Sequence, residues 1–262
     1  MRFLCFHGRG TNSQVSTLRS HDIKHRINCL GQQIMESQIA ALRHELDNIH
    51  TYDYVEGTVP APLAPGKSIT IVLERTLVDI GRPLELEAFF PTNGHYYDYF
   101  SFESADSVQK ALDDLASFLE TEGPYDGLIA FSLGGALTST YLIREARRHP
   151  EKPLPFKCAI FLSGGAPLDP VALERGEVSL LDDTVAGNQV LRGLPTVHIW
   201  GSNDKLWGDR SERLYALCDP HERTMVLHED GHAVPGVRAK EALLRSVRAI
   251  RRTVGRVAMA SW

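Results

Sequence analysis

Short apolar runs alternate with amphipathic stretches over most of this 262-residue chain. Buried strands of a parallel sheet are continuous apolar runs of about four to eight residues, whereas surface helices repeat apolar residues every three or four positions. The expected strands lie at 2–6, 52–55, 127–131, 158–162, 196–200 and 224–227, and the expected helices at 34–46, 104–119, 133–148, 210–217 and 240–256. The alternation predicts an α/β fold, a mostly parallel sheet with helices on both faces.

Composition limits the classes of protein to which the chain can belong. Hydrophobic residues make up 43% and charged residues 23%, which is typical of a chain that buries a core and excludes disorder as the main state. With no repeat, linker or low-complexity segment, we expect one domain over residues 1–262. The net charge of −5 provides no basic field for nucleic acid or an acidic membrane.

The chain shows neither a membrane signal nor a cysteine framework. No apolar run approaches the length of about 18 residues that a membrane span needs, and the amino terminus lacks the apolar core of a signal peptide. We therefore expect a soluble, cytoplasmic protein. Cys5, Cys29, Cys158 and Cys218 match neither a zinc spacing nor a disulfide framework, so no metal site is expected. The apolar surroundings of Cys5 and Cys158 predict buried free thiols.

A candidate nucleophile directly follows the expected strand at 127–131. The segment Ala130-Phe131-Ser132-Leu133-Gly134 resembles the G-x-S-x-G nucleophile elbow, with Ala in place of the first Gly. Such an elbow is a strained strand-to-helix turn that exposes the serine Oγ, and small flanking residues let neighbouring backbone approach. The alternative is that Ser132 only caps the following helix.

An acid and a base follow two later strands. Asp204 comes after the expected strand at 196–200, and His232 comes after the last expected strand. Because parallel strands end at one edge of the sheet, both side chains are expected near Ser132. The order Ser, Asp, His along the chain is that of α/β-hydrolases and predicts a catalytic triad. Three nearby residues offer the same chemistry from less suitable positions: Asp209, His221 and His228.

A glycine-rich turn follows the first expected strand. In His7-Gly8-Arg9-Gly10 the glycines let backbone N–H groups approach a ligand. We expect the backbone N–H groups of Arg9 and Leu133 to donate to an oxyanion, a role in which each donor stabilises the transition state by about 3 kcal/mol. The alternative is a turn that binds no ligand.

Several motifs spread over the chain resemble the fungal serine hydrolases of the FSH and LovG type. They are FLCFHGRGTNS at 3–13, EGTVPAP at 56–62, YDG at 125–127, the elbow at 130–134 and GHAVP at 231–235. The resemblance implies an α/β-hydrolase fold, a triad of Ser132, Asp204 and His232, and no cofactor. Members of this family include esterases and thioesterases, and several release the finished acyl chain from a carrier domain in polyketide pathways.

The sequence thus predicts a serine hydrolase that cleaves an ester or thioester. The favoured function is a thioesterase or esterase of secondary metabolism that releases a polyketide-type chain, with the acyl-carrier domain of a synthase as partner. The alternatives are a general carboxylesterase for small acyl esters and a non-catalytic α/β-hydrolase that binds a ligand. The aromatic stretch at 89–102 either roofs an acyl pocket or covers the edge of the core.

Two stretches, 15–33 and 67–81, match neither the strand–helix alternation nor the family. One hypothesis is that both are retained introns in the gene model. Val15-Ser16 can be encoded by GTGAGT, which resembles a splice donor, and Gln33 by CAG, which resembles an acceptor. The alternative is genuine insertions in surface loops, which folded proteins tolerate. A cDNA that contains both stretches in full would exclude the intron hypothesis.

Overall fold

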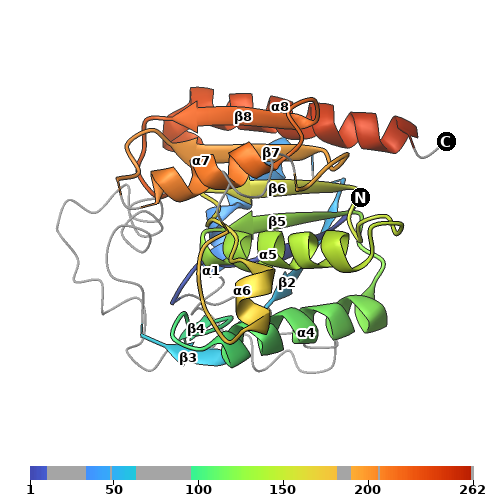
Figure 1. The fold of residues 1–262 in the computed structure, drawn as a ribbon. Helices are drawn as coiled ribbons and strands as arrows, with labels where there is room; N and C mark the ends of the chain where they lie inside the picture. Colours follow the sequence, from blue (N-terminus) through green and yellow to red (C-terminus); the bar gives the residue numbers. More distant parts are fainter. Residues whose placement is uncertain (11–33, 48, 63–95, 182–189, 206, 261–262) are drawn as a thin grey trace, which may run out of the picture.

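A six-stranded parallel sheet forms the centre of the molecule (Figure 1). The structure is a computed structural model that describes residues 1–10, 34–47, 49–62, 96–181, 190–205 and 207–260. The strand order is β2-β1-β5-β6-β7-β8. The strands are β1 (Arg2–Phe6), β2 (Thr51–Val55), β5 (Gly127–Phe131), β6 (Cys158–Leu162), β7 (Thr196–Gly201) and β8 (Arg223–His228). Each neighbouring pair is parallel, which confirms the predicted α/β fold.

Helices cover both faces of this sheet. In Figure 1, α4, α5, α6 and α7 lie in front of it, and α1, α2 and α8 lie behind. The helices are α1 (Ile34–Gln38), α2 (Ala40–Glu45), α4 (Ala105–Glu122), α5 (Leu133–Arg148), α6 (Pro170–Glu174), α7 (Gly208–Leu217) and α8 (Lys240–Ala260), with a 3-10 turn, η3 (Val237–Ala239), before α8. The predicted helix at 34–46 is divided into α1 and α2. The short α6 was not predicted, because five residues carry too little periodicity.

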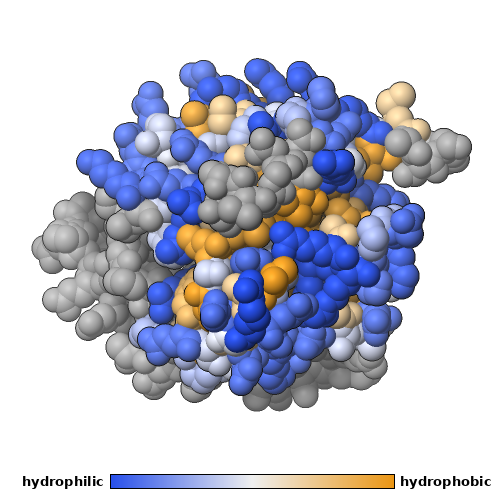
Figure 2. Space-filling view, viewed as in Figure 1, coloured by the Kyte–Doolittle hydropathy of each residue, from blue (hydrophilic) through white to orange (hydrophobic). Residues whose placement is uncertain are grey.

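The central strands β1, β5 and β6 supply both cores in alternation. In β1, Leu4 and Phe6 pack with α4 and α5, while Phe3 and Cys5 pack with the residues of α2 and α8. Successive side chains of a strand point to opposite faces, so a strand covered on both sides must be apolar throughout. This is why the strands could be identified as uninterrupted apolar runs. Figure 2 shows that the front surface is mostly hydrophilic, with an apolar strip across its middle.

A second, two-stranded sheet lies below the main one in Figure 1 and was not predicted. It pairs β3 (Val59–Ala61) antiparallel with β4 (Tyr96–Asp98), where the sequence indicated only a break after the second strand. Gly57 permits the pairing, because a Cβ there would lie 2.5 Å from the backbone oxygen of Asp98. Tyr99 and Phe100 follow β4 and are buried in the core. These two rings cover the core edge, and residues 89–95 lie outside the described residues.

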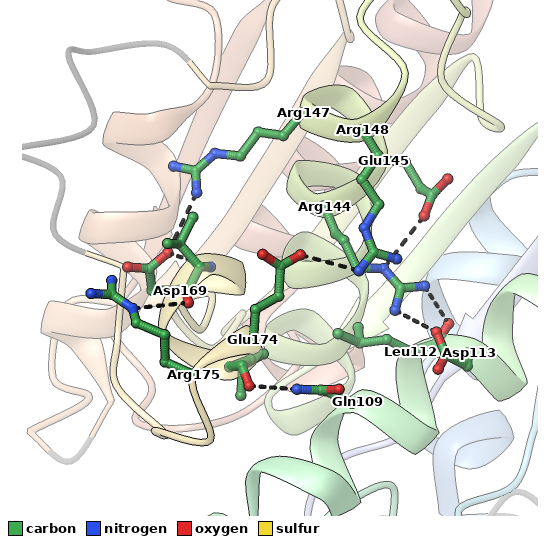
Figure 3. Close-up of polar contacts among 12 residues, drawn as sticks. Gln109, Leu112, Asp113, Arg144, Glu145, Arg147, Arg148, Asp169, Glu174 and Arg175 are labelled. Carbon is green, nitrogen blue, oxygen red and sulfur yellow. Dashed lines mark hydrogen bonds and ion pairs between the residues drawn. The ribbon is translucent and has the colours of Figure 1, made fainter.

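Polar contacts tie α6 and α4 to α5 (Figure 3). Arg144, almost fully buried in α5, donates at 2.6 Å to Asp113 and at 3.0 Å to the backbone oxygen of Leu112 in α4. Arg148 pairs with Glu174 of α6 at 3.2 Å. The exposed pair contributes little to stability, whereas the buried guanidinium must keep its partners. Helices α4 and α6 are therefore fixed against α5, the helix that begins directly after Ser132.

The structure also tests the smaller expectations. Cys5 and Cys158 are buried free thiols, as predicted, and Cys218 is a third. Within the described ranges, no helix is long and apolar enough to cross a membrane. The stretches 15–33 and 67–81 lie outside the described residues. That residues 1–262 form a single domain stays a prediction.

Candidate active site

Ser132 lies in the sharp turn between β5 and α5. Its backbone has φ 51° and ψ −113°, a strained conformation for a residue with a side chain. Hydrogen bonds to β6 and to the segment after it hold this backbone: the Ser132 N–H donates to the backbone oxygen of Leu162 at 3.1 Å, and the N–H of Gly165 donates to the Ser132 carbonyl at 2.9 Å. The side chain is nearly buried, with 5% of the residue exposed. The surrounding backbone thus determines where the hydroxyl lies.

Small residues around the turn are required by space. A Cβ on Gly134 would lie 2.6 Å from the Cβ of Phe6 and 2.8 Å from the backbone oxygen of His7. A Cβ on Gly135 would lie 2.8 Å from the Cα of Gly164. Close backbone approach therefore explains the glycines that follow Ser132 in the sequence motif.

Ser132, His232 and Asp204 form a continuous chain of hydrogen bonds. His232 Nε2 lies 2.8 Å from Ser132 Oγ, and His232 Nδ1 lies 2.6 Å from Asp204 Oδ2. The Asp204 side chain is 1% exposed, and its other oxygen accepts from the N–H of Trp207 at 3.0 Å. A carboxylate next to Nδ1 favours the tautomer with the proton on Nδ1, which leaves Nε2 free to accept the serine proton.

The loops that carry Asp204 and His232 are joined directly. The N–H of Ser202 donates to the backbone oxygen of His228 at 2.8 Å, and Asn203 Nδ2 donates to that of Glu229 at 2.7 Å. Both contacts continue the pairing of β7 with β8 beyond the strand ends. The rings of Phe131 and Trp207 flank His232, with centroids 5.1 and 5.9 Å from its own. The imidazole is therefore held by packing as well as by Asp204.

The weaker candidates lie elsewhere. Asp209 is exposed in the first turn of α7, and His221 is exposed in the turn before β8. His228 is buried, and burial lowers its pKa. Its ring lies 3.8 Å from the Asp230 carboxylate. The structure brings Ser132, Asp204 and His232 together and none of these three residues with them.

The turn after β1 lies against Ser132. A Cβ on Gly8 would lie 2.8 Å from the Phe131 ring and 3.3 Å from the Cβ of Ser132. His7 Nε2 accepts from the N–H of Gly57 at 3.0 Å, so the ring proton is on Nδ1, which lies 2.7 Å from the Gly8 carbonyl. In a trans peptide the C=O and N–H point in opposite directions, so this contact turns the N–H of Arg9 away from the His7 ring.

Two residues at the end of β4, Asp98 and the following Tyr99, complete the support of this turn. The N–H of His7 donates to the Tyr99 hydroxyl at 2.8 Å, and the two rings stack with centroids 4.5 Å apart. Asp98 accepts from the N–H of Gly10 at 2.7 Å and from Arg9 Nε at 3.1 Å. Burial raises the pKa of Tyr99 well above its ordinary value, so the hydroxyl stays neutral. Sequence reasoning missed His7, Asp98 and Tyr99, although the His-Gly pair after the first strand was a usable signal.

Comparison with known proteins identifies the family. The family described as "Serine hydrolase (FSH1)" matches residues 1–242. The chain belongs to this family. Esterase FPY3 of Fusarium mangiferae is 34% identical over 239 residues, which cover 90% of this chain and 89% of that protein. Hydrolase phiM of Talaromyces stipitatus is 28% identical over 242 residues, covering 90% and 81%.

Solved structures resemble this FSH1-family protein in fold. The carboxylesterase from Mesorhizobium loti has a TM-score of 0.54 at 13% identity, covering 97% of this chain and 88% of that one. Esterase PE8 has a TM-score of 0.52 at 16% identity, covering 96% and 92%. The α/β-hydrolase fold predicted from the sequence is thereby confirmed. The protein is a serine hydrolase. Among the described residues, no group of three or more His, Cys, Asp or Glu side chains could hold a metal ion.

Proposed function

We propose that Ser132, His232 and Asp204 are the catalytic triad of this hydrolase. The observation that carries the proposal is the unbroken hydrogen-bond chain from Asp204 through His232 to Ser132, at 2.6 and 2.8 Å. Ser132 Oγ attacks the carbonyl carbon while His232 Nε2 takes its proton, and Asp204 stabilises the imidazolium. His232 then gives that proton to the leaving group, and water hydrolyses the acyl-enzyme by the same steps.

The backbone N–H groups of Arg9 and Leu133 are proposed to bind the oxyanion of the tetrahedral intermediate. Leu133 is the first residue of α5, and its N–H directly follows the nucleophile. The peptide between Gly8 and Arg9 is held by the contact of its carbonyl with His7 Nδ1 at 2.7 Å. A donor that is already oriented needs no reorganisation when charge develops on the substrate oxygen.

We further propose that the acyl group arrives as a thioester on a carrier domain and leaves as a polyketide-type acid. This proposal rests on the likeness to fungal hydrolases of the FSH and LovG type. The second candidate is a carboxylesterase that acts on small esters, and the name of the relative Esterase FPY3 favours it. Both functions use the same triad, so they differ only in the substrate that is hydrolysed fastest.

Comparing long-chain acyl thioesters with short p-nitrophenyl esters tests the substrate class. The thioesterase function predicts a higher kcat/KM on the long thioesters, and Ser132→Ala abolishes both activities. Equal, weak turnover of short esters alone contradicts it and supports the carboxylesterase. Ligand binding that survives Ser132→Ala in a protein without turnover would indicate a non-catalytic binding module instead.

A further inference from the structure

An arginine of α7 lies next to the site without a described acidic partner. The Arg210 guanidinium carbon is 4.1 Å from the centroid of the Trp207 ring. That ring is in turn 5.9 Å from the His232 ring, and the N–H of Trp207 donates to Asp204. The indole of Trp207 therefore connects Arg210 with two members of the proposed triad.

The surroundings of Arg210 disfavour its positive charge. Burial lowers the pKa of the guanidinium, and the neighbouring charge of Arg213 lowers it further. Eight of the sixteen other arginines on the described part of the chain have a carboxylate within ion-pair distance: Arg2, Arg9, Arg43, Arg144, Arg147, Arg148, Arg251 and Arg256. Arg210 forms no such pair with a described residue. A half-buried cation without a counter-ion reduces stability unless a ligand supplies the anion.

Helix formation does not account for this arginine. Arg210 lies in the first turn of α7, which begins at Gly208. The amino-terminal end of a helix carries partial positive charge, so a cation there is unfavourable. Acyl transfer also makes His232 cationic, and a second positive charge nearby raises the energy of that state. An anionic group on the substrate would offset both the unfavourable position of Arg210 at the helix terminus and its repulsion of the His232 cation.

We propose that Arg210, held on the face of Trp207, binds an anionic group of the substrate, a carboxylate or a phosphate. The inference rests on the proposed function, because it places the anion relative to Ser132 as nucleophile. The charge has two possible sources in a substrate of this reaction. One is a carboxylate at the far end of the acyl group, and the other is a phosphate in the thiol that leaves. Both match the planar guanidinium, which donates two parallel hydrogen bonds.

Two matched substrate pairs distinguish these sources. The first pair is the mono-4-nitrophenyl ester of a dicarboxylic acid and the same compound with its free carboxyl methylated. The second pair is an acyl-coenzyme A and the same acyl group on neutral N-acetylcysteamine. The variants are Arg210→Gln, Arg210→Lys and the control Arg252→Gln. Arg252 is exposed in α8, behind the sheet, so its replacement removes the same charge on the opposite side of the sheet from α7 (Figure 1).

The wild-type protein should prefer the anionic member of at least one pair. Arg210→Gln should lower kcat/KM for that substrate about tenfold, mainly through KM, because one charge-assisted contact is lost. The neutral members should keep their rates in Arg210→Gln, and all four substrates should keep theirs in Arg252→Gln. Arg210→Lys should retain part of the preference, since an ammonium keeps the charge but not the planar contact. High salt should weaken the preference in the wild type.

The outcomes separate the inference from the proposed function. Loss confined to the ester pair places the carboxylate on the acyl group, and loss confined to the thioester pair identifies a phosphate in the leaving group. Equal loss on neutral and anionic members, or no loss on either pair, overturns the role of Arg210. Calorimetric binding of coenzyme A and of the free dicarboxylate to Ser132→Ala gives a readout without turnover, and affinities that Arg210→Gln leaves unchanged also overturn it. Failure of the proposed function is seen separately, as a Ser132 that does not react with a fluorophosphonate.

Discussion

Replacing Gly135 by alanine tests whether backbone packing holds the turn at Ser132. An added Cβ would lie 2.8 Å from the Cα of Gly164 and 3.0 Å from the N of Gly165, and neither backbone atom can move freely. Overpacking of this kind costs about 1–3 kcal/mol. Alanine also favours a helix over glycine by about 1 kcal/mol, which partly offsets the cost. Gly255→Ala in α8 gains the same helix term without the clash, because no described atom lies within 4 Å of its Cβ.

The difference in the free energy of unfolding between Gly135→Ala and Gly255→Ala measures the cost of the clash at Gly135. Urea unfolding should show Gly255→Ala more stable than the wild type and Gly135→Ala less stable than Gly255→Ala by about 1–3 kcal/mol. Gly135→Ala should also lose esterase activity, because Gly165 holds the Ser132 carbonyl at 2.9 Å. Equal stabilities for the two variants, with activity retained, would refute this account of the turn.

Three further predictions follow from individual side chains. Asp204→Asn should lower kcat about 10⁴-fold without unfolding the protein, because the tautomer of His232 is no longer fixed; a loss below tenfold would argue against the triad. Burial lowers the pKa of His198 to about 3. Between pH 6.5 and pH 3 the imidazole therefore binds a proton in the unfolded chain but stays neutral in the folded protein. The free energy of unfolding should therefore fall on acidification from pH 6.5 toward 3, by about 1.4 kcal/mol per pH unit from this group, and His198→Phe should reduce that slope in urea titrations. Burial raises the pKa values of Cys158 and Cys218 to about 12, so iodoacetamide should alkylate them only in urea, as read by mass spectrometry.

The sheet and the three candidate catalytic residues could be predicted because their signals are local. Strands such as β5 and β6 are buried on both faces, so every residue in them is apolar or small and the strand is visible in the sequence as an uninterrupted run. Each candidate follows a strand of the sheet, and parallel strands bring their carboxyl ends to one edge. Ser132 and His232 are 100 positions apart, and because β6 and β7 lie between β5 and β8, the loop after β8 must reach back across that edge to Ser132.

The features that were missed depend on contacts between distant segments. β3 contains Pro60 and pairs with β4, more than 30 residues away, and no local pattern announces that pairing. The role of Tyr99 depends on reaching His7 across the fold, 92 positions away. Likewise, Arg210 resembles any surface arginine until its ring partner and its missing carboxylate are known. These contacts become visible only when the fold brings distant segments together, and hydrophobic periodicity in the sequence does not reveal them.

Fluorophosphonate labelling tests the central claim most directly. A working triad makes Ser132 react with the probe at neutral pH, and peptide mapping should find the adduct on that residue. Labelling should disappear in Ser132→Ala and in His232→Ala, and it should persist in Ser139→Ala, a buried serine of the same helix. An adduct on another residue, or labelling that survives His232→Ala at the wild-type rate, would contradict the assignment of Ser132 as the activated nucleophile.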